Sequence, residues 1–112
     1  MNDTADIATI ATPVSSRDEV LLRLRRHEVE IRKFGATALY LFGSAARDEM
    51  TDESDVDVFI DYERDGNFTF VEFFDLKDFL SSKVHRKIDL ATRDGLHPRL
   101  KSRIERSSVK VF

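Results

Sequence analysis

The sequence predicts one small domain of the α/β (α+β) class, with a mixed sheet and helices packed mainly on one of its faces. Segments whose apolar residues recur at helical spacing alternate with short apolar or period-two segments typical of strands, in the order helix then strand, four times over. The 112 residues suffice for one hydrophobic core but not for an additional substrate domain. We therefore expect a flexible tail over 1–14 and a single domain over 15–112.

The first helix is predicted between Ser16 and Gly35. Ser16 and Glu19 have the spacing of a capping box, the apolar residues that follow recur at helical intervals, and glycine is a natural helix end. His27 falls beside the apolar stripe. A partly buried histidine is the favoured interpretation of that position, because no second histidine is suitably spaced to share a metal ion.

A strand over 37–42 is predicted to stop at Gly43, where a residue without a Cβ lets the backbone approach a ligand closely. Ser44 then begins a short helix, and the free N–H groups and dipole of a helix start favour a phosphate there. Arg47 lies three residues after Ser44, on the same helical face, and is a candidate phosphate contact. An ordinary surface ion pair with Asp52 or Glu53 is the alternative for this arginine.

Two carboxylates follow in the next predicted strand. Asp55 and Asp57 alternate with valines, so both side chains point to one face, about 6–7 Å apart along the strand. Asp89 occupies a third strand pattern, between Ile88 and Leu90, and would complete a group of three. Carboxylates that face a phosphate site are typical of a nucleotide site with Mg²⁺, which prefers one or two carboxylates plus phosphate oxygens.

The segment from Asp61 to Glu72 nearly fits the calcium-binding loop of an EF-hand, with acidic residues at alternate positions, a central Gly66 and a closing glutamate. An EF-hand needs a helix before the loop, whereas the preceding segment has a strand pattern. A turn at Asp65 and Gly66, followed by a capping box from Thr69 to Glu72, is therefore the preferred interpretation.

The rest of the chain supplies two further helices and a last strand. Apolar groups cover more than half of the helix predicted over 70–80, so we expect it to pack against the sheet and to leave a flank for a partner. A helix over 97–106 and a strand over 109–112 follow. Basic residues follow the helix predicted over 70–80, where they suit the negative C-terminal end of the helix dipole. Contact with a nucleotide is the alternative role for these residues. These basic residues are Lys83, His85, Arg86 and Lys87.

Composition excludes several classes of function. A net charge of -3 and a pI near 5.6 argue against an extended nucleic-acid surface, which would be basic. The chain has no cysteine, so it has neither disulfides nor thiolate metal sites, and a cytoplasmic location is expected. No apolar run approaches the length of a membrane span.

The motifs carry a family resemblance. Gly43-Ser44, ten intervening residues, Asp55-x-Asp57 and a later Asp89 resemble the signature of the DNA-polymerase-β-type nucleotidyltransferase superfamily. Together with the flanking segments 41–47, 54–58 and 87–90, they are similar to the minimal nucleotidyltransferases (MNT). The resemblance implies the nucleotidyltransferase fold and a magnesium-dependent transfer of AMP from ATP to a hydroxyl group. It assigns the three aspartates to catalysis and metal binding, and it assigns Gly43, Ser44 and Arg47 to the nucleotide.

In that family the partner resembles a HEPN ribonuclease toxin, so the resemblance implies an antitoxin that adenylylates a tyrosine of its toxin. Two alternatives stay open: a catalytically weak module that neutralises the toxin by contact alone, and transfer to a small molecule. Asp48 supports the first alternative, because members often have glycine after the arginine and a carboxylate adds negative charge near the phosphate end. The base preference and the oligomeric state are not predicted.

Overall fold

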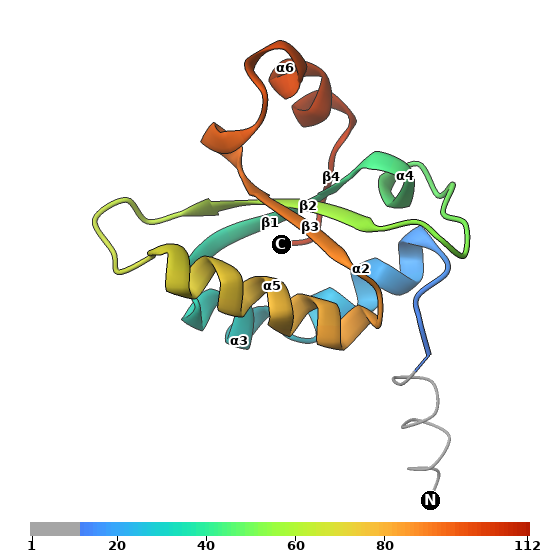
Figure 1. Cartoon of the computed structure of the whole chain (residues 1–112), viewed down its shortest axis with the longest axis horizontal. Helices are drawn as coiled ribbons and strands as arrows, with labels where there is room; N and C mark the ends of the chain where they lie inside the picture. The colour runs from blue at the N-terminus through green and yellow to red at the C-terminus, as the bar shows by residue number, and fades with distance from the viewer. Residues whose placement is uncertain (1–11) are drawn as a thin grey trace, which may run out of the picture.

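The computed structural model describes residues 12–112, so residues 1–11 of the predicted tail lie outside the description. Helices and strands alternate as expected (Figure 1). In chain order the elements are α2 (Arg17–Arg25), α3 (Glu28–Lys33), β1 (Ala36–Phe42), α4 (Gly43–Ala46), β2 (Val56–Tyr62), α5 (Phe70–Val84), β3 (Ile88–Thr92), the 3₁₀ turn η1 (Arg93–Gly95), α6 (Pro98–Ser107) and β4 (Val109–Lys110).

The four strands form one mixed sheet in the order β3-β2-β1-β4. Strand β1 runs antiparallel to β2 and β4, and β2 runs parallel to β3. Helices α2, α3 and α5 lie along one face of the sheet, whereas α6 stands on the other side (Figure 1). The predicted mixed sheet with helices mainly on one face is therefore confirmed. Within residues 12–112, no helix is long and apolar enough to cross a membrane.

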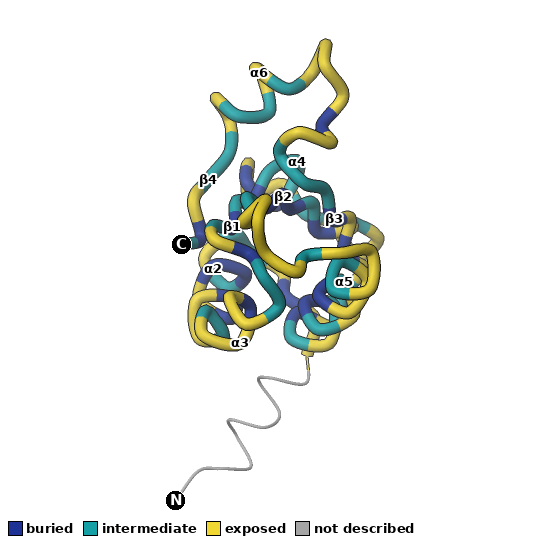
Figure 2. Tube along the Cα trace, turned by 90° about the vertical axis from the view of Figure 1, so that its left-hand side faces the viewer, coloured by how far each residue is buried: buried dark blue, intermediate teal, exposed yellow. Residues whose placement is uncertain are grey.

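The core lies between the sheet and those three helices, where the buried residues gather (Figure 2). Val56, Val58 and Ile60 of β2 belong to it. Because side chains alternate along a strand, Asp57 and Phe59 point to the opposite face. The Phe59 side chain is nonetheless buried there.

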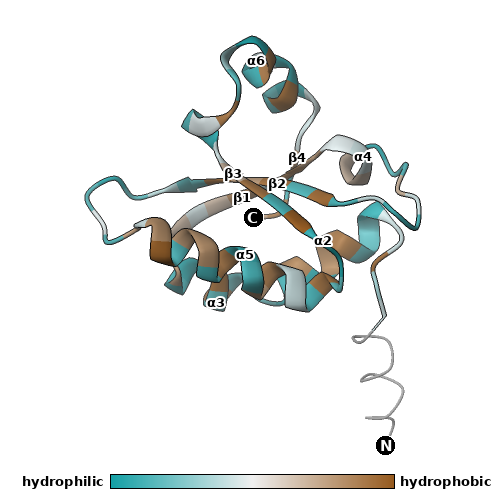
Figure 3. Ribbon diagram, in the orientation of Figure 1, coloured by the Kyte–Doolittle hydropathy of each residue, from teal (hydrophilic) through white to brown (hydrophobic). Residues whose placement is uncertain are grey.

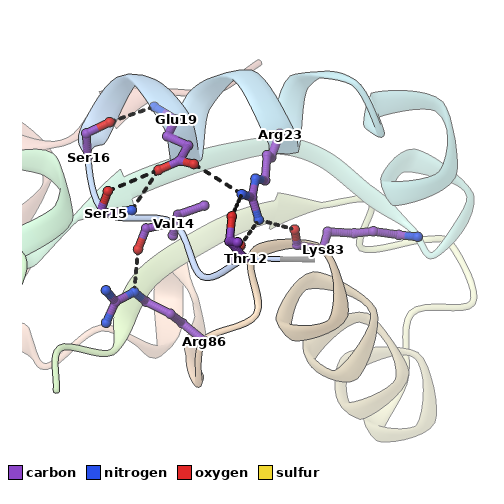
Figure 4. Close-up of polar contacts among 8 residues, drawn as sticks. All are labelled: Thr12, Val14, Ser15, Ser16, Glu19, Arg23, Lys83 and Arg86. Carbon is purple, nitrogen blue, oxygen red and sulfur yellow. Dashed lines mark hydrogen bonds and ion pairs between the residues drawn. The ribbon is translucent and has the colours of Figure 1, made fainter. Parts of the chain in front are cut away.

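The chain begins to pack before residue 15, at the end of the predicted tail (Figure 4). Val14 is fully buried in the core, its N–H donates to the carbonyl of Val84, and its own carbonyl accepts from Nε of Arg86. Arg23 donates to the carbonyl of Thr12. Residues 12–14 thus belong to the folded unit, because Val14 supplies an apolar side chain to the core beside α5.

The predicted continuous helix between Ser16 and Gly35 is wrong, since the structure has two helices that meet at His27. Neither glycine nor proline marks this break. The His27 imidazole meets the ring of Phe79 edge-on at 5.7 Å between centroids, and its Nδ1 lies 3.1 Å from Glu30. The interpretation of His27 as a partly buried histidine is confirmed.

The segment after β2 forms a turn and then α5, as preferred over an EF-hand. Thr69 and Glu72 form the capping box in both directions: the Thr69 N–H donates to Oε1 of Glu72 at 2.8 Å, and the Thr69 hydroxyl accepts from the N–H of Val71. Asp61, the first residue of the apparent calcium loop, instead binds Arg93 on the other side of the sheet. Asp61 and Glu72, the first and last acidic residues of this segment, therefore have structural partners.

Candidate active site

The strand register brings two predicted site residues, Asp57 and Asp89, side by side and places a third, Gly43, at the adjacent strand end. Phe42 at the end of β1 lies opposite Asp57 on β2, and Asp57 lies opposite Asp89 on β3. Gly43 directly follows Phe42, so the turn from β1 into α4 begins next to the carboxylate of Asp57. The site thus occupies one end of the sheet, on the face that α2, α3 and α5 leave open.

Gly43 is required at its position for two reasons. Its φ is 70°, in the left-handed region that glycine adopts without strain. In addition, a Cβ built on Gly43 would lie 2.2 Å from Oδ2 of Asp57, far inside any permitted contact. The backbone of the turn therefore lies directly against the carboxylate of Asp57. The close approach to a ligand that the sequence suggested at Gly43 stays a prediction.

Asp57 carries the electrostatic signature of the site. The pKa of Asp57 is raised from its ordinary 3.8 to about 6, first by burial and then by the negative charges of Asp89 and Asp55, while Arg47 opposes them. Asp57 is half-buried, whereas Asp55 and Asp89 are exposed. Since the other two carboxylates and the arginine all act on Asp57, the predicted residues share one electrostatic environment that a cation would stabilise.

The carboxylates do not form a closed metal cage by themselves. Within residues 12–112, no three His, Cys, Asp or Glu side chains come close enough together to hold a metal ion. Magnesium commonly takes one or two protein carboxylates and completes its shell with substrate phosphates and water. A half-buried carboxylate with a raised pKa, between two further negative charges and against a glycine turn, fits that donor set.

Ser44 and Arg47 lie on the short helix that Gly43 begins. Ser44 is half-buried, and its carbonyl accepts from the N–H of Glu49 at 2.8 Å. Arg47 caps the C-terminal end of α4 and pairs through Nε with Oε1 of Glu49 at 2.8 Å, both side chains being mostly exposed. The alternative role for Arg47 was a surface ion pair with Asp52 or Glu53. The structure shows such a pair, but with Glu49 as the partner. An exposed pair of this kind contributes little stability, so it does not fix the position of Arg47 strongly.

Asp48 has a structural role in this protein. Its φ is 59°, a left-handed conformation that aspartate tolerates better than most residues. Its Oδ1 accepts from the N–H of Arg17 at 2.8 Å, at the start of α2. A carboxylate at a helix N-terminus is favourable. The negative charge of Asp48 is therefore bound to α2.

Arg86 is a structural residue of the site that the sequence did not reveal. Its Nη1 donates to the carbonyls of Thr51, Asp52 and Ser54, at 3.0, 3.2 and 3.1 Å, and so holds the loop that leads into Asp55. The sequence pattern suggested a basic helix end or a nucleotide contact. No local signal marks the actual role, because the loop carbonyls lie 32 to 35 residues away along the chain.

A glycine turn at a strand end, set against carboxylates on two neighbouring strands of a small mixed sheet, is the arrangement of a nucleotidyltransferase. The chain belongs to the nucleotidyltransferase domain family, whose model matches residues 17–111. It is 33% identical over 90 residues to a Methanocaldococcus jannaschii protein named "Putative protein adenylyltransferase MJ1379", covering 79% of this chain and 90% of the relative. It is 28% identical over 95 residues to the protein adenylyltransferase MntA of Thermococcus cleftensis, covering 84% and 94%.

Solved structures agree on the fold. A structure described as a "putative minimal nucleotidyltransferase" superimposes with a TM-score of 0.66 at 28% identity, covering 80% of this chain and 93% of the other. A second, the tri-AMPylated Shewanella oneidensis HEPN toxin in complex with its MNT antitoxin, gives a TM-score of 0.58 at 16% identity, covering 83% and 71%. The predicted nucleotidyltransferase fold is therefore confirmed.

Proposed function

We propose that this protein transfers AMP from ATP to a tyrosine hydroxyl of a cognate HEPN toxin and thereby acts as the antitoxin. The observation that carries the proposal is the turn at Gly43 against Asp57, which the register sets beside Asp89. The names of the relatives support AMP transfer to protein, and the complex of an MNT antitoxin with an AMPylated HEPN toxin supports the partner.

Each predicted residue has a role in this proposal. Asp55, Asp57 and Asp89 would hold Mg²⁺, which neutralises charge on the attacking and leaving oxygens. The backbone N–H groups at Gly43 and Ser44 would bind the triphosphate of ATP. Arg47 would leave Glu49 for a phosphate oxygen, since a guanidinium binds both anions well.

The reaction is an in-line displacement at the α-phosphorus. The acceptor oxygen forms a bond to that phosphorus while the bond to the bridging α–β oxygen breaks, and pyrophosphate leaves with the electron pair. Asp89 is exposed at the edge of the site, where it would take the proton from the acceptor hydroxyl. AMP then remains on the acceptor oxygen as a phosphodiester.

A protein is the acceptor in this proposal, because the relatives are named as protein adenylyltransferases. The net charge of -3 does not favour RNA. The catalytic face of the sheet lies outside the main core, so a protein acceptor can bring its own contact surface to the site.

The test uses the protein product of the adjacent gene as acceptor. Incubation with ATP and Mg²⁺ should raise its intact mass by about 329 Da for each AMP added, as expected for a two-metal transfer that releases pyrophosphate. A variant with Asp55→Ala and Asp57→Ala should still bind that protein and add nothing. If the wild type protects cells while the mass of the partner stays unchanged, and the variant protects equally well, then neutralisation occurs by contact alone.

A further inference from the structure

The first turns of α5 expose large apolar side chains. Phe70 is 82% exposed, Val71 65% and Phe74 55%, and we refer to these three residues as the α5 patch. The start of α5 is correspondingly apolar in Figure 3. Further along the same helix Leu76 and Leu80 are fully buried against the sheet. The core therefore does not account for the α5 patch, and contiguous exposed apolar groups of this kind mark interaction sites.

An open hollow of about 510 Å³ lies beside the α5 patch. Its walls are mostly aromatic and rigidly packed: Tyr62 stacks on Phe68 at 5.0 Å between centroids, and Phe73 meets Phe74 edge-on at 5.4 Å. A preformed apolar pocket suits an inserted aromatic or aliphatic anchor. The residues that line it are Tyr62, Phe68, Thr69, Phe70, Phe73, Phe74 and Thr92.

Acidic side chains surround this surface. Glu63 and Asp65 are exposed in the turn before the hollow, and Asp75 and Asp78 are exposed on α5. No Lys, Arg or His of residues 12–112 pairs with any of these four carboxylates. Two basic residues lie nearby. Arg64 forms an ion pair with Asp94 at 2.8 Å, and Lys77 on α5 is half-buried. The rim therefore has a net negative charge.

We propose that the α5 patch and its hollow are the docking site for the acceptor protein, which binds through an apolar segment flanked by lysine or arginine side chains. This inference rests on the proposed function for the identity of the partner. A second copy of this chain is disfavoured as the occupant, because it would bring the same acidic rim against itself. Three exposed side chains and the hollow offer about 400–500 Å² of apolar surface, roughly half of one partner's share of a standard interface.

The docking site is separate from the site of transfer. Tyr62, in the wall of the hollow, lies five residues beyond Asp57 on β2, about 17 Å along the strand. The α5 patch lies on the helix-covered side of the sheet, whereas Asp57 points to the other side. Replacements in the patch should therefore weaken capture of the acceptor without changing how ATP binds.

The first experiment combines Phe70→Ala with Phe74→Ala. Both side chains are exposed, so the fold should be kept. The matched control replaces the exposed Leu22 of α2 and Val29 of α3 by alanine. We expect the affinity for the adjacent-gene protein, measured by calorimetry, to fall at least about tenfold in the patch variant. It should change less than about twofold in the control, with ATP binding unchanged in both.

Unchanged partner affinity in the patch variant, while the wild type still adds AMP, would overturn the docking site and leave the proposed function intact. Lost affinity in a protein whose wild type adds no AMP would support the docking site and reject the transfer. A wild-type dimer that becomes monomeric in the patch variant, with partner affinity unchanged, would show that a second copy covers this surface and would overturn the proposal.

The second experiment tests the charge of the partner. Asp75→Lys with Asp78→Lys should weaken binding at least about tenfold at low salt and by less at 0.5 M salt, because screening removes rim electrostatics. Asp18→Lys, at an exposed acidic residue of α2, is the matched control and should have little effect. Stronger binding by the charge-reversed variant would show that the partner surface is acidic and would overturn the proposal.

Discussion

At the scale of single residues, Gly43 has the least room for a side chain among the four glycines. Gly43→Ala should reduce AMP transfer at least about 100-fold, because a Cβ 2.2 Å from Oδ2 of Asp57 must displace the turn or the carboxylate. The left-handed backbone adds a cost of about 1–2 kcal/mol to the folded state. Transfer is followed by the mass of the acceptor and stability by urea unfolding. Gly66→Ala is the control, since its Cβ would lie no closer than 3.3 Å to a neighbour; equal activity in the two variants would contradict the role of Gly43.

Asp57 should make the stability of the metal-free protein depend on pH. Its pKa is about 6 in the folded protein against an ordinary 3.8, so the folded state binds the proton more tightly. The free energy of unfolding should therefore fall as the pH rises from about 4 to above 6. Asp57→Asn removes this charge, so the variant should have a free energy of unfolding about 1 kcal/mol higher than the wild type at pH 7.5, with allowance for solvent exposure. At pH 3.5 the two proteins should be almost equally stable. Urea titrations in EDTA measure this, and an equal gain at both pH values would exclude the titration of Asp57 as its cause.

At the scale of helices and strands, the sequence predicted those elements whose signals are local. The capping box at Thr69 and Glu72 and the proline that opens α6 are contained within a few residues, and both helices begin there. The break at His27 was missed because no glycine, proline or capping side chain marks it, and the residue that packs on the imidazole, Phe79, is far along the chain. Periodicity assigns residues to a face, but it does not indicate where a helix stops when no cap or breaker marks the place.

The candidate site shows the same division. Alternation placed Asp55 and Asp57 on one face, and Asp89 was recognised as a strand residue. That Asp57 lies opposite both Phe42 and Asp89 depends on strand register, which long-range pairing sets. The role of Arg86 was hidden for a related reason, since a guanidinium that binds backbone carbonyls leaves no side-chain pattern to detect.

Arg86→Met should loosen the loop before Asp55. The replacement leaves loop carbonyls without their donor, so the free energy of unfolding should drop by about 2–3 kcal/mol. Because the loop positions Asp55, the Mg²⁺ concentration that gives half-maximal transfer should also rise several-fold. Arg64→Met is the control: its exposed pair with Asp94 should be worth less than about 1 kcal/mol. A stability loss without any change in magnesium dependence would limit Arg86 to a structural role.

At the scale of the whole molecule, the sheet separates the hydrophobic core from the candidate site. One face supports the core with α2, α3 and α5, and the other carries Asp57 at one end. Towards the other end of that face, Arg93 donates to Asp61 of β2 and Glu105 of α6 at 2.7 Å each, and its guanidinium lies 4.9 Å from the Tyr40 ring. This cluster ties α6 to the face of the sheet that carries Asp57, at a distance from the candidate site.

Because the site gathers negative charge, its ligand should stabilise the entire domain. A ligand at 100 times its dissociation constant adds about 2.7 kcal/mol to the free energy of unfolding, and for a domain of this size we expect a rise of about 10 °C in Tm. Mg²⁺ with a non-hydrolysable ATP analogue should produce this shift, and EDTA should remove it.

The variant with Asp55→Ala and Asp57→Ala should have a higher Tm than the wild type when no ligand is present, since like charges are removed. Its Tm should hardly change when the analogue is added. Scanning calorimetry measures both effects, and a full shift in EDTA or in the double variant would mean that the nucleotide binds without these carboxylates.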